Sequence, residues 1–272
     1  MRKKPYPTDL HDTEWQLIQP LLPQPNHAPQ RGRPTEVDYR EIVNALRYIA
    51  RSGCAWDMLP HDFPPSDTVY YYFRKWSKDG TLKHIHTALH QQMRKQEGRS
   101  EQPTLGIIDS QSVKTTVESG WYSGFDGGKQ VKGRKRHVVV DILGYALGLK
   151  VQDASIQDRD GAKEVLKEVL ETYPSLELIL TDSIYNGDSL MSWIAAYDVK
   201  MEAVKKQKEQ KGFVVQAKRW LVERLFGWLE RWRRLAKDYE RKPERSESML
   251  YLVLSSIMLT KLARPKTSWR QT

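Results

Sequence analysis

The sequence predicts an α/β protein in which a mixed sheet flanked by helices follows a small all-helical region. Three features favour this fold class. Apolar residues recur at helical spacing in the first 96 residues, strand patterns begin near residue 104, and strands then alternate with helices. The 272 residues can form one large domain or two modest ones with real cores. We therefore divide the chain into a helical domain at 1–96, a polar linker at 97–103 and an α/β domain at 104–272.

The N-terminal domain contains three predicted helices. The first covers Thr13 to Leu22, the second covers Val37 to Ala50, and a proline-rich connector lies between them. A third helix is expected to begin at Ser66-Asp67, because these residue types are preferred at helix N-termini, and to run through Trp76. Helix, turn and aromatic-basic helix are typical of a helix-turn-helix-like DNA-binding domain, and the alternative is that the rings only pack a core. The residues of this helix expected to contact DNA are Tyr70, Arg74 and Lys75.

The C-terminal domain changes to strand patterns separated by helices. Its first three predicted strands cover 104–109, 137–143 and 145–152, with Gly144 turning the last two into a hairpin. The order then continues with a helix, a strand, a helix, a strand and a long helix from about Val214. This order is expected of a ribonuclease-H-like fold, although other α/β folds fit it as well.

Three acidic residues of this domain suggest metal chemistry. Asp109 and Asp182 each follow a run of apolar residues, where a carboxylate must cap a helix, pair with a cation or bind a metal. If the two strands are neighbours, their tips lie about 5 Å apart and their oxygens can share a metal. Glu223 lies in the long helix, on the side opposite its apolar face, where the alternative is an ordinary solvated surface. Oxygen ligands without a cysteine cluster or a paired histidine motif predict two Mg²⁺ or Mn²⁺ ions rather than zinc.

The charge of the chain predicts a polyanionic partner. Lys and Arg outnumber Asp and Glu by 44 to 34, giving a net charge of +10, so nucleic acid is the first candidate and an anionic membrane surface the second. No run approaches the ~18 apolar residues that span a bilayer, and no apolar signal-peptide core follows Met1. With Cys54 as its single cysteine, the chain fits a reducing compartment, and we expect a cytoplasmic, nucleoid-associated protein.

Further basic residues are candidates for contacts with DNA phosphates. The glycine-rich segment from Gly120 to His137 is predicted to be a loop next to Asp109, and its cations either clamp phosphates or form solvated surface. The segment around residues 31–34 either lies in a minor groove or is a plain loop. The predicted DNA-binding cations of the loop are Lys129, Lys132, Arg134, Lys135 and Arg136, and those elsewhere are Arg31, Arg33, Arg219, Arg231 and Arg234.

Several motifs occur together in one order. They are Ile108-Asp-Ser-Gln-Ser-Val-Lys, Lys132-Gly-Arg-Lys-Arg-His-Val-Val-Val-Asp and the stretch from Val222 to Glu240, with Arg51-Ser-Gly-Cys-Ala-Trp-Asp-Met-Leu-Pro nearer the N-terminus. Together they resemble bacterial insertion-sequence transposases of the Asp-Asp-Glu (DDE) type, of the group named for insertion sequence five. The resemblance implies a ribonuclease-H-like fold, a catalytic triad of Asp109, Asp182 and Glu223, and a homodimer acting on paired ends of double-stranded element DNA and on target DNA. Ile184 stands where this family commonly has glycine.

These features predict a transposase that binds terminal inverted repeats and carries out metal-dependent DNA cleavage and strand transfer. Two alternatives stay open. One is a catalytically inactive, transposase-derived DNA-binding regulator, which would not need all three acids. The other is a ribonuclease-H-like nuclease or resolvase, which would share the sheet and the metals but would not join a 3′-hydroxyl to a new target.

Overall fold

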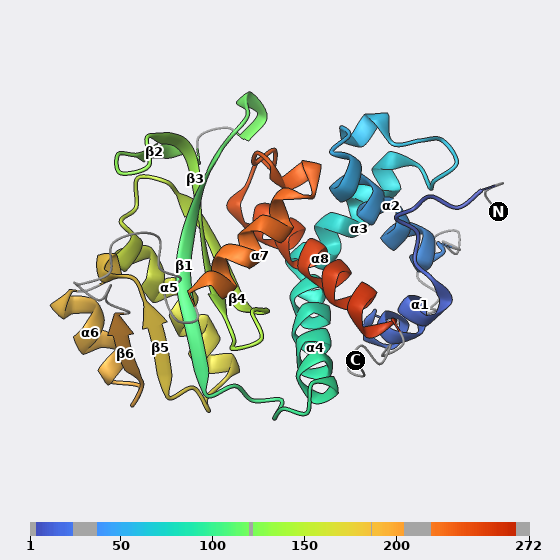
Figure 1. Cartoon of the computed structure of the whole chain (residues 1–272). Coiled ribbons are helices and arrows are strands. Elements are labelled where there is room, and N and C mark those ends of the chain that lie inside the picture. Colours follow the sequence, from blue (N-terminus) through green and yellow to red (C-terminus); the bar gives the residue numbers. More distant parts are fainter. Residues whose placement is uncertain (1–3, 24–36, 120–121, 186, 204–218, 265–272) are drawn as a thin grey trace, which may run out of the picture.

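The computed structural model describes residues 4–23, 37–119, 122–185, 187–203 and 219–264. The chain forms a mixed sheet with helices on its faces, and the N-terminal helices pack to one side of it (Figure 1). The α/β fold class predicted from the sequence is therefore confirmed.

Four helices precede the sheet: α1 (Asp12–Ile18), α2 (Tyr39–Ser52), α3 (Ser66–Lys78) and α4 (Thr81–Gln96). The Asp38 carboxylate caps α2 by accepting the Arg40 N–H at 2.8 Å, and Gly53 ends this helix at a φ of 74°. The first helix is shorter than predicted because Pro20 follows, and a 3₁₀ turn at Gln19–Leu21 takes its place. The fourth helix, α4, was not singled out in the sequence.

The sheet has six strands: β1 (Leu105–Lys114), β2 (Gly124–Asp126), β3 (Val131–Val140), β4 (Ala146–Asp153), β5 (Leu178–Thr181) and β6 (Lys200–Ala203). The long strands lie in the order β4-β3-β1-β5-β6, and the short strand β2 also pairs with β3. β3 is antiparallel to β1, β2 and β4, whereas β5 is parallel to both β1 and β6. This order, with its helical crossovers, is that of a ribonuclease-H-like fold.

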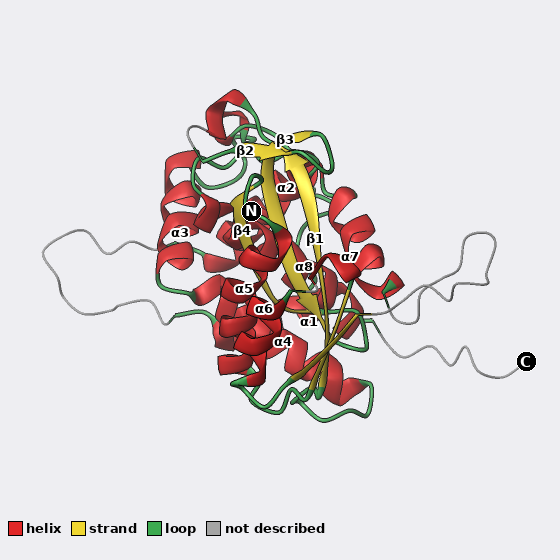
Figure 2. Ribbon diagram, turned by 90° about the vertical axis from the view of Figure 1, so that its left-hand side faces the viewer, coloured by secondary structure: helices red, strands yellow, loops and turns green. Residues whose placement is uncertain are grey.

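Four helices belong to the sheet region: α5 (Asp158–Thr172), α6 (Asp188–Ala195), α7 (Trp220–Glu230) and α8 (Pro243–Leu262). Figure 2 shows α5 and α7 on opposite sides of the sheet. Successive strand residues supply the two faces, because side chains alternate along a strand. Ile108 and Val139 belong to the apolar cluster that contains α5, whereas Ile107 and Val138 belong to the cluster that contains α7 and α8.

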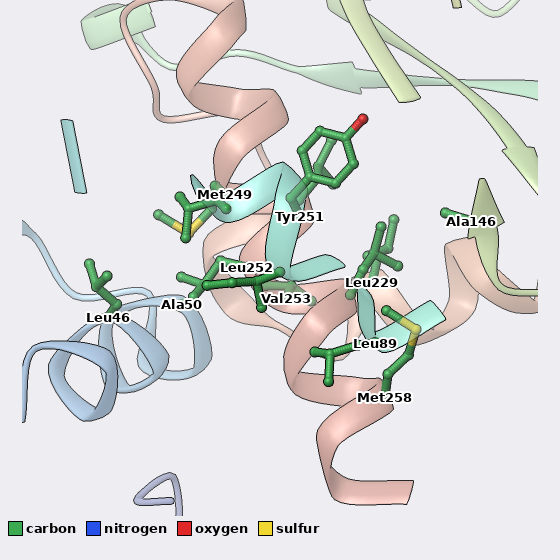
Figure 3. Close-up of a cluster of buried hydrophobic side chains, with 14 of the residues drawn as sticks. Leu46, Ala50, Leu89, Ala146, Leu229, Met249, Tyr251, Leu252, Val253 and Met258 are labelled. Atoms are coloured by element: carbon green, nitrogen blue, oxygen red, sulfur yellow. The ribbon is translucent and has the colours of Figure 1, made fainter. Parts of the chain in front are cut away.

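Helix α8 joins the N-terminal helices to the sheet through one core. It is apolar around most of its circumference, as expected of a helix surrounded by protein. In Figure 3, Val253 and Met258 of α8 lie with Leu46 of α2, Leu89 of α4 and Ala146 of β4. A fragment ending near residue 96 would expose the face of α4 that packs on α8, so the experiments proposed below use the full chain.

Two predicted elements are wrong in their extent. The apolar pattern of the long helix continues to Leu235 in the sequence, but α7 ends at Glu230 because the next residues contact the N-terminal helices. Arg51 of α2 donates a hydrogen bond to the Arg231 carbonyl at 2.6 Å, and this contact lies outside any helical pattern. The predicted start of this helix near Val214 lies outside the described residues. The predicted loop from Gly120 to His137 is also wrong, because β2 and most of β3 occupy it.

Candidate active site

Asp109 and Asp182 are brought side by side by the pairing of β1 with β5. Leu105 pairs with Leu178 and Ile107 with Leu180, a constant offset of 73 residues that also separates Asp109 from Asp182. Asp109 and Asp182 therefore lie at matching positions, two residues beyond the last paired residues, Ile107 and Leu180. β1 and β5 are neighbours, which is the condition stated for the two acids to share a metal. Asp109 is not at the end of its strand, because β1 continues to Lys114 by pairing with β3 after β5 has ended.

A single guanidinium connects these two carboxylates. Nη2 of Arg219 lies 3.3 Å from Oδ2 of Asp109, and Nη1 lies 3.0 Å from Oδ2 of Asp182. The side chains of Arg219, Asp109 and Asp182 are 15%, 19% and 27% exposed, so the arrangement is sheltered but open to solvent. The two acids thus lie close enough to share one cation.

Glu223 approaches the same place from α7. This helix follows Arg219, and Glu223 lies one turn later, about 6 Å along the axis. The other end of α7 is held on β1 by a hydrogen bond of 3.0 Å from Gln111 Nε2 to Glu230 Oε1. Glu223 is an exposed carboxylate of α7 between these two attachments to β1, the Arg219 ion pair with Asp109 before it and the Glu230 hydrogen bond after it.

The surroundings shift the pKa values of the two aspartates in opposite directions. Burial raises the pKa of Asp109, and the Ser110 N–H, Arg219 and Lys129 only partly offset this effect. Burial also raises the pKa of Asp182, but the Ser183 hydroxyl, Arg219 and nearby backbone N–H groups outweigh it and bring the pKa below its usual value. Loss of solvent therefore dominates the pKa of Asp109, whereas hydrogen bonds and the charge of Arg219 dominate the pKa of Asp182.

The donor set fits a hard divalent cation. Carboxylate oxygens from two strands already hold one positive group between them, and Mg²⁺ and Mn²⁺ prefer such oxygen ligands. Within the ranges that the structure describes, no three acidic, histidine or cysteine side chains are gathered closely enough to form a complete metal site. Glu223 would have to turn towards the aspartates to become a ligand.

Ile184 causes no backbone strain beside Asp182. It lies in a 3₁₀ turn at Ser183–Tyr185 and is not among the described residues with positive φ. Its side chain is 60% exposed, and its N–H points to Oδ1 of Asp182 at 3.4 Å. The turn therefore does not require the glycine that the resemblance led us to expect at this position.

Two protein-family models match the chain. Residues 10–86 match a family described as "Putative transposase of IS4/5 family", and residues 100–259 match "Transposase DDE domain". The chain belongs to the DDE transposases of the IS4/5 family. No curated protein matches the chain. The transposase has no helix, among those described, that is long and apolar enough to cross a membrane.

A charged cluster behind Asp109 of the transposase was not predicted. The Lys135 ammonium lies 3.4 Å from Asp158 Oδ1 and 3.5 Å from Asp126 Oδ2. Ser110, next to Asp109, donates a hydrogen bond to Asp158 and accepts one from Lys129. The cluster therefore supports the backbone at Asp109, and no local motif predicts it because its members come from β1, β2, β3 and α5.

The basic run of the transposase is largely buried. Alternate residues of β3 point to opposite faces, so Arg134 and Arg136 face the segment between α7 and α8, whereas Lys135 faces α5. Arg134 is fully buried, lies 3.1 Å from Asp238 Oδ1 and donates to the Glu240 carbonyl at 2.7 Å. Arg136 is buried against the Leu235 carbonyl, and burial lowers its pKa to about 10. The structure therefore makes these three cations parts of the core, and only Lys129 and Lys132 of the predicted clamp are exposed.

The other residues predicted to contact DNA also divide into buried and exposed side chains. Arg234 is buried, with Nη2 2.8 Å from Glu240 Oε1, whereas Arg231 is exposed. On α3 the hydroxyl of Tyr70 accepts a hydrogen bond from Arg245 of α8, so this ring connects two helices. Arg74 and Lys75 are exposed, and so is Tyr71, which was not predicted. Arg31 and Arg33 lie outside the described residues.

Proposed function

We propose that this DDE transposase recognises the terminal inverted repeats of an insertion sequence, cleaves the DNA there, and joins the resulting 3′-hydroxyl ends to target DNA. Asp109, Asp182 and Glu223 would hold two Mg²⁺ or Mn²⁺ ions. The observation that carries this proposal is the matched position of the two aspartates on neighbouring strands, where they already share one cation.

The site can bind, orient and neutralise the reacting phosphodiester. Two ions bound there would activate the attacking water or 3′-hydroxyl and stabilise the leaving oxygen. The sheet would hold the two aspartates in place, and Glu223 would complete the ligand set from α7. Lys129 reaches the Asp109 side of the site, because its ammonium donates to the Ser110 carbonyl at 2.9 Å.

DNA would lie across two exposed basic surfaces. One is on α3 and contains Tyr71, Arg74 and Lys75; the other contains Lys129, whose ammonium reaches Ser110 beside Asp109, together with exposed Lys132 and Arg231. A homodimer that pairs two element ends would place one such site on each end, as the resemblance to this family implies. Buried Arg134, Lys135, Arg136 and Arg234 are not included in the proposed contact surface.

Strand transfer is the test that separates this function from the alternatives. The full chain would be incubated with a labelled duplex carrying one end of the element, a supercoiled target plasmid and Mg²⁺. A transposase joins the labelled 3′ end to the plasmid. A nuclease or resolvase would cleave without joining, and a DNA-binding regulator would only shift the duplex in a gel.

Exposed Lys129 and Lys132 should contact DNA phosphates. Replacing Lys129 and Lys132 together by Gln is expected to weaken binding to element-end and random DNA by similar factors, since phosphate contacts carry no sequence information. The slope of log K against log salt concentration should fall by about 2 units in a filter-binding or fluorescence assay. Lys167→Gln, at an exposed position of α5, is the matched control. Loss of binding to element ends alone would show instead that the lysines read bases.

Helix α3 should contribute to recognition of the element end. Its buried face, with Phe73 and Trp76, belongs to the core, so exposed Arg74 and Lys75 can be replaced by Ala without disturbing packing. If Arg74 contacts a base, its replacement should cost about 1–3 kcal/mol of binding to element ends and much less for random DNA. If the Arg74/Lys75 double variant gives the same DNA footprint as the wild type, α3 does not recognise the element end.

A further inference from the structure

Arg219 occupies the position between Asp109 and Asp182 that a metal ion needs. Its two terminal nitrogens contact Oδ2 of each acid at 3.3 and 3.0 Å. We propose that the Arg219 guanidinium is an internal counter-ion, which neutralises the two aspartates before a divalent ion binds and leaves them when the ion is bound. This inference rests on the proposed function, because it assumes that the two aspartates are metal ligands.

The need for a counter-ion follows from the sheet. Strand pairing fixes two carboxylates side by side at matched positions, where they repel each other when both are ionised. A planar guanidinium suits this place, since its terminal N–H groups can reach one oxygen of each acid at the same time. The single positive charge of Arg219 leaves the two carboxylates undercompensated, whereas a divalent ion that replaces it supplies two.

The guanidinium and a divalent ion compete for the same oxygens. Both Oδ2 atoms contact Arg219, so an ion bound between the acids would meet the guanidinium at short range, and the two positive groups would repel. Arg219 precedes α7 and carries a long, flexible side chain, so its guanidinium can move without a change in the fold. A phosphate of bound DNA would offer the displaced guanidinium a pair of oxygens in place of the carboxylates.

The proposal has a measurable consequence for metal affinity. If Arg219 bridges the acids in about nine of ten molecules, the apparent affinity for the ion is about ten-fold weaker than that of the open site. Removing the guanidinium should therefore tighten metal binding, although Arg219 belongs to the active site. A residue that only supported the fold, or that helped to hold the ion, would not produce this effect.

The test is a titration of the full chain with Mn²⁺ in the absence of DNA, with free Mn²⁺ measured by electron paramagnetic resonance. Arg219→Gln should bind Mn²⁺ about ten-fold more tightly than the wild type. The Mn²⁺ affinity of Arg219→Lys should be intermediate, since an ammonium keeps the positive charge but lacks the two terminal nitrogens that contact both acids at once. Arg224→Gln is the matched control from α7, the helix that follows Arg219, because Arg224 donates to the Leu143 carbonyl at 2.7 Å and packs on Trp220 and Trp228. Its Mn²⁺ affinity should equal that of the wild type.

Thermal unfolding gives a second readout that needs no DNA or catalysis. Without metal, Arg219→Gln should unfold at a lower temperature than the wild type, and added Mn²⁺ should stabilise the variant more. Equal or weaker Mn²⁺ affinity of Arg219→Gln overturns the counter-ion proposal, even if the variant is less stable. If Asp109→Asn abolishes Mn²⁺ binding while Arg219→Gln does not change it, the metal site stands and only this inference fails. If neither the wild type nor Arg219→Gln binds Mn²⁺, the proposed metal site fails as well.

Discussion

Replacing Asp109 or Asp182 by Asn, or Glu223 by Gln, is expected to lower the rate of Mg²⁺-dependent DNA cleavage by roughly 10²-fold to 10³-fold or more. A lost ligand removes several kcal/mol of transition-state stabilisation, and each 1.36 kcal/mol corresponds to a factor of ten. Binding of element-end DNA should persist or become tighter, because each substitution removes a negative charge beside the phosphates. Cleavage would be measured in single turnover and binding by gel shift.

The effects of these substitutions on the cleavage rate should not be additive. Metal ligands act as a unit, so the double variant of Asp109 and Asp182 should be about as inactive as either single variant. Glu230→Gln is the matched control for Glu223→Gln, since Glu230 is an exposed carboxylate on the same helix and the glutamine keeps the oxygen that accepts from Gln111. Its cleavage rate should be close to that of the wild type. Wild-type cleavage by the Glu223 variant would remove this residue from the proposed site.

The positions of the aspartates could be predicted because they depend on short, strongly patterned strands. Two apolar runs that end in Asp predict two buried strands. The sequence leaves open whether these strands are neighbours; the structure pairs them with the same offset that separates the acids. The position of Glu223 relative to the apolar face of its helix also followed from local periodicity. Arg219 could be identified as a nearby cation, but its bridge between Asp109 and Asp182 depends on the folded arrangement.

The burial of most cations in residues 129–136 could not be predicted, because their partners are distant in the sequence. Five cations within eight residues suggest a solvated loop, yet Arg134 is neutralised by Asp238 and bonds to the Glu240 carbonyl, more than 100 residues later. The early end of α7 has the same cause. Arg234 continues the helical pattern, but its guanidinium binds Glu240 and the Cys54 carbonyl of the N-terminal region. Tertiary contacts override local pattern at both places.

Asp141 is expected to have the largest effect on stability. This buried carboxylate in the turn between β3 and β4 lies 2.5 Å from Nη1 of Arg94 and 3.3 Å from Nε2 of His90, both on α4. Its other oxygen accepts the N–H groups of Leu143 and Tyr145. Asp141→Ala should lower the free energy of unfolding by about 3–5 kcal/mol, because it leaves a buried arginine unpaired.

Two further variants, compared by urea denaturation, test this explanation: one separates the charge of Asp141 from its hydrogen bonds, and the other breaks an exposed ion pair. Asp141→Asn keeps an oxygen for the turn N–H groups but removes the charge opposite Arg94, so its loss of stability should be smaller than that of the Ala variant. Asp12→Asn breaks an ion pair with Arg40 in which the Asp12 side chain is 84% exposed, and it should cost at most about 1 kcal/mol. Equal costs for Asp12→Asn and Asp141→Ala would show that the buried pair does not stabilise the fold.

The difference between the wild type and Asp141→Asn should depend on pH. Burial raises the pKa of Asp141, but hydrogen bonds from His90, Arg94 and the Tyr145 N–H, with the attraction of His90, lower it overall. A carboxyl whose pKa is lower in the folded state stabilises the fold above its unfolded pKa, about 3.9. This contribution disappears as the pH falls through the folded value. The difference in unfolding free energy should therefore be constant from about pH 5 to 7 and should shrink below about pH 4. A difference that persists unchanged at about pH 3 would mean that the Asp141 charge is not what binds α4 to the sheet.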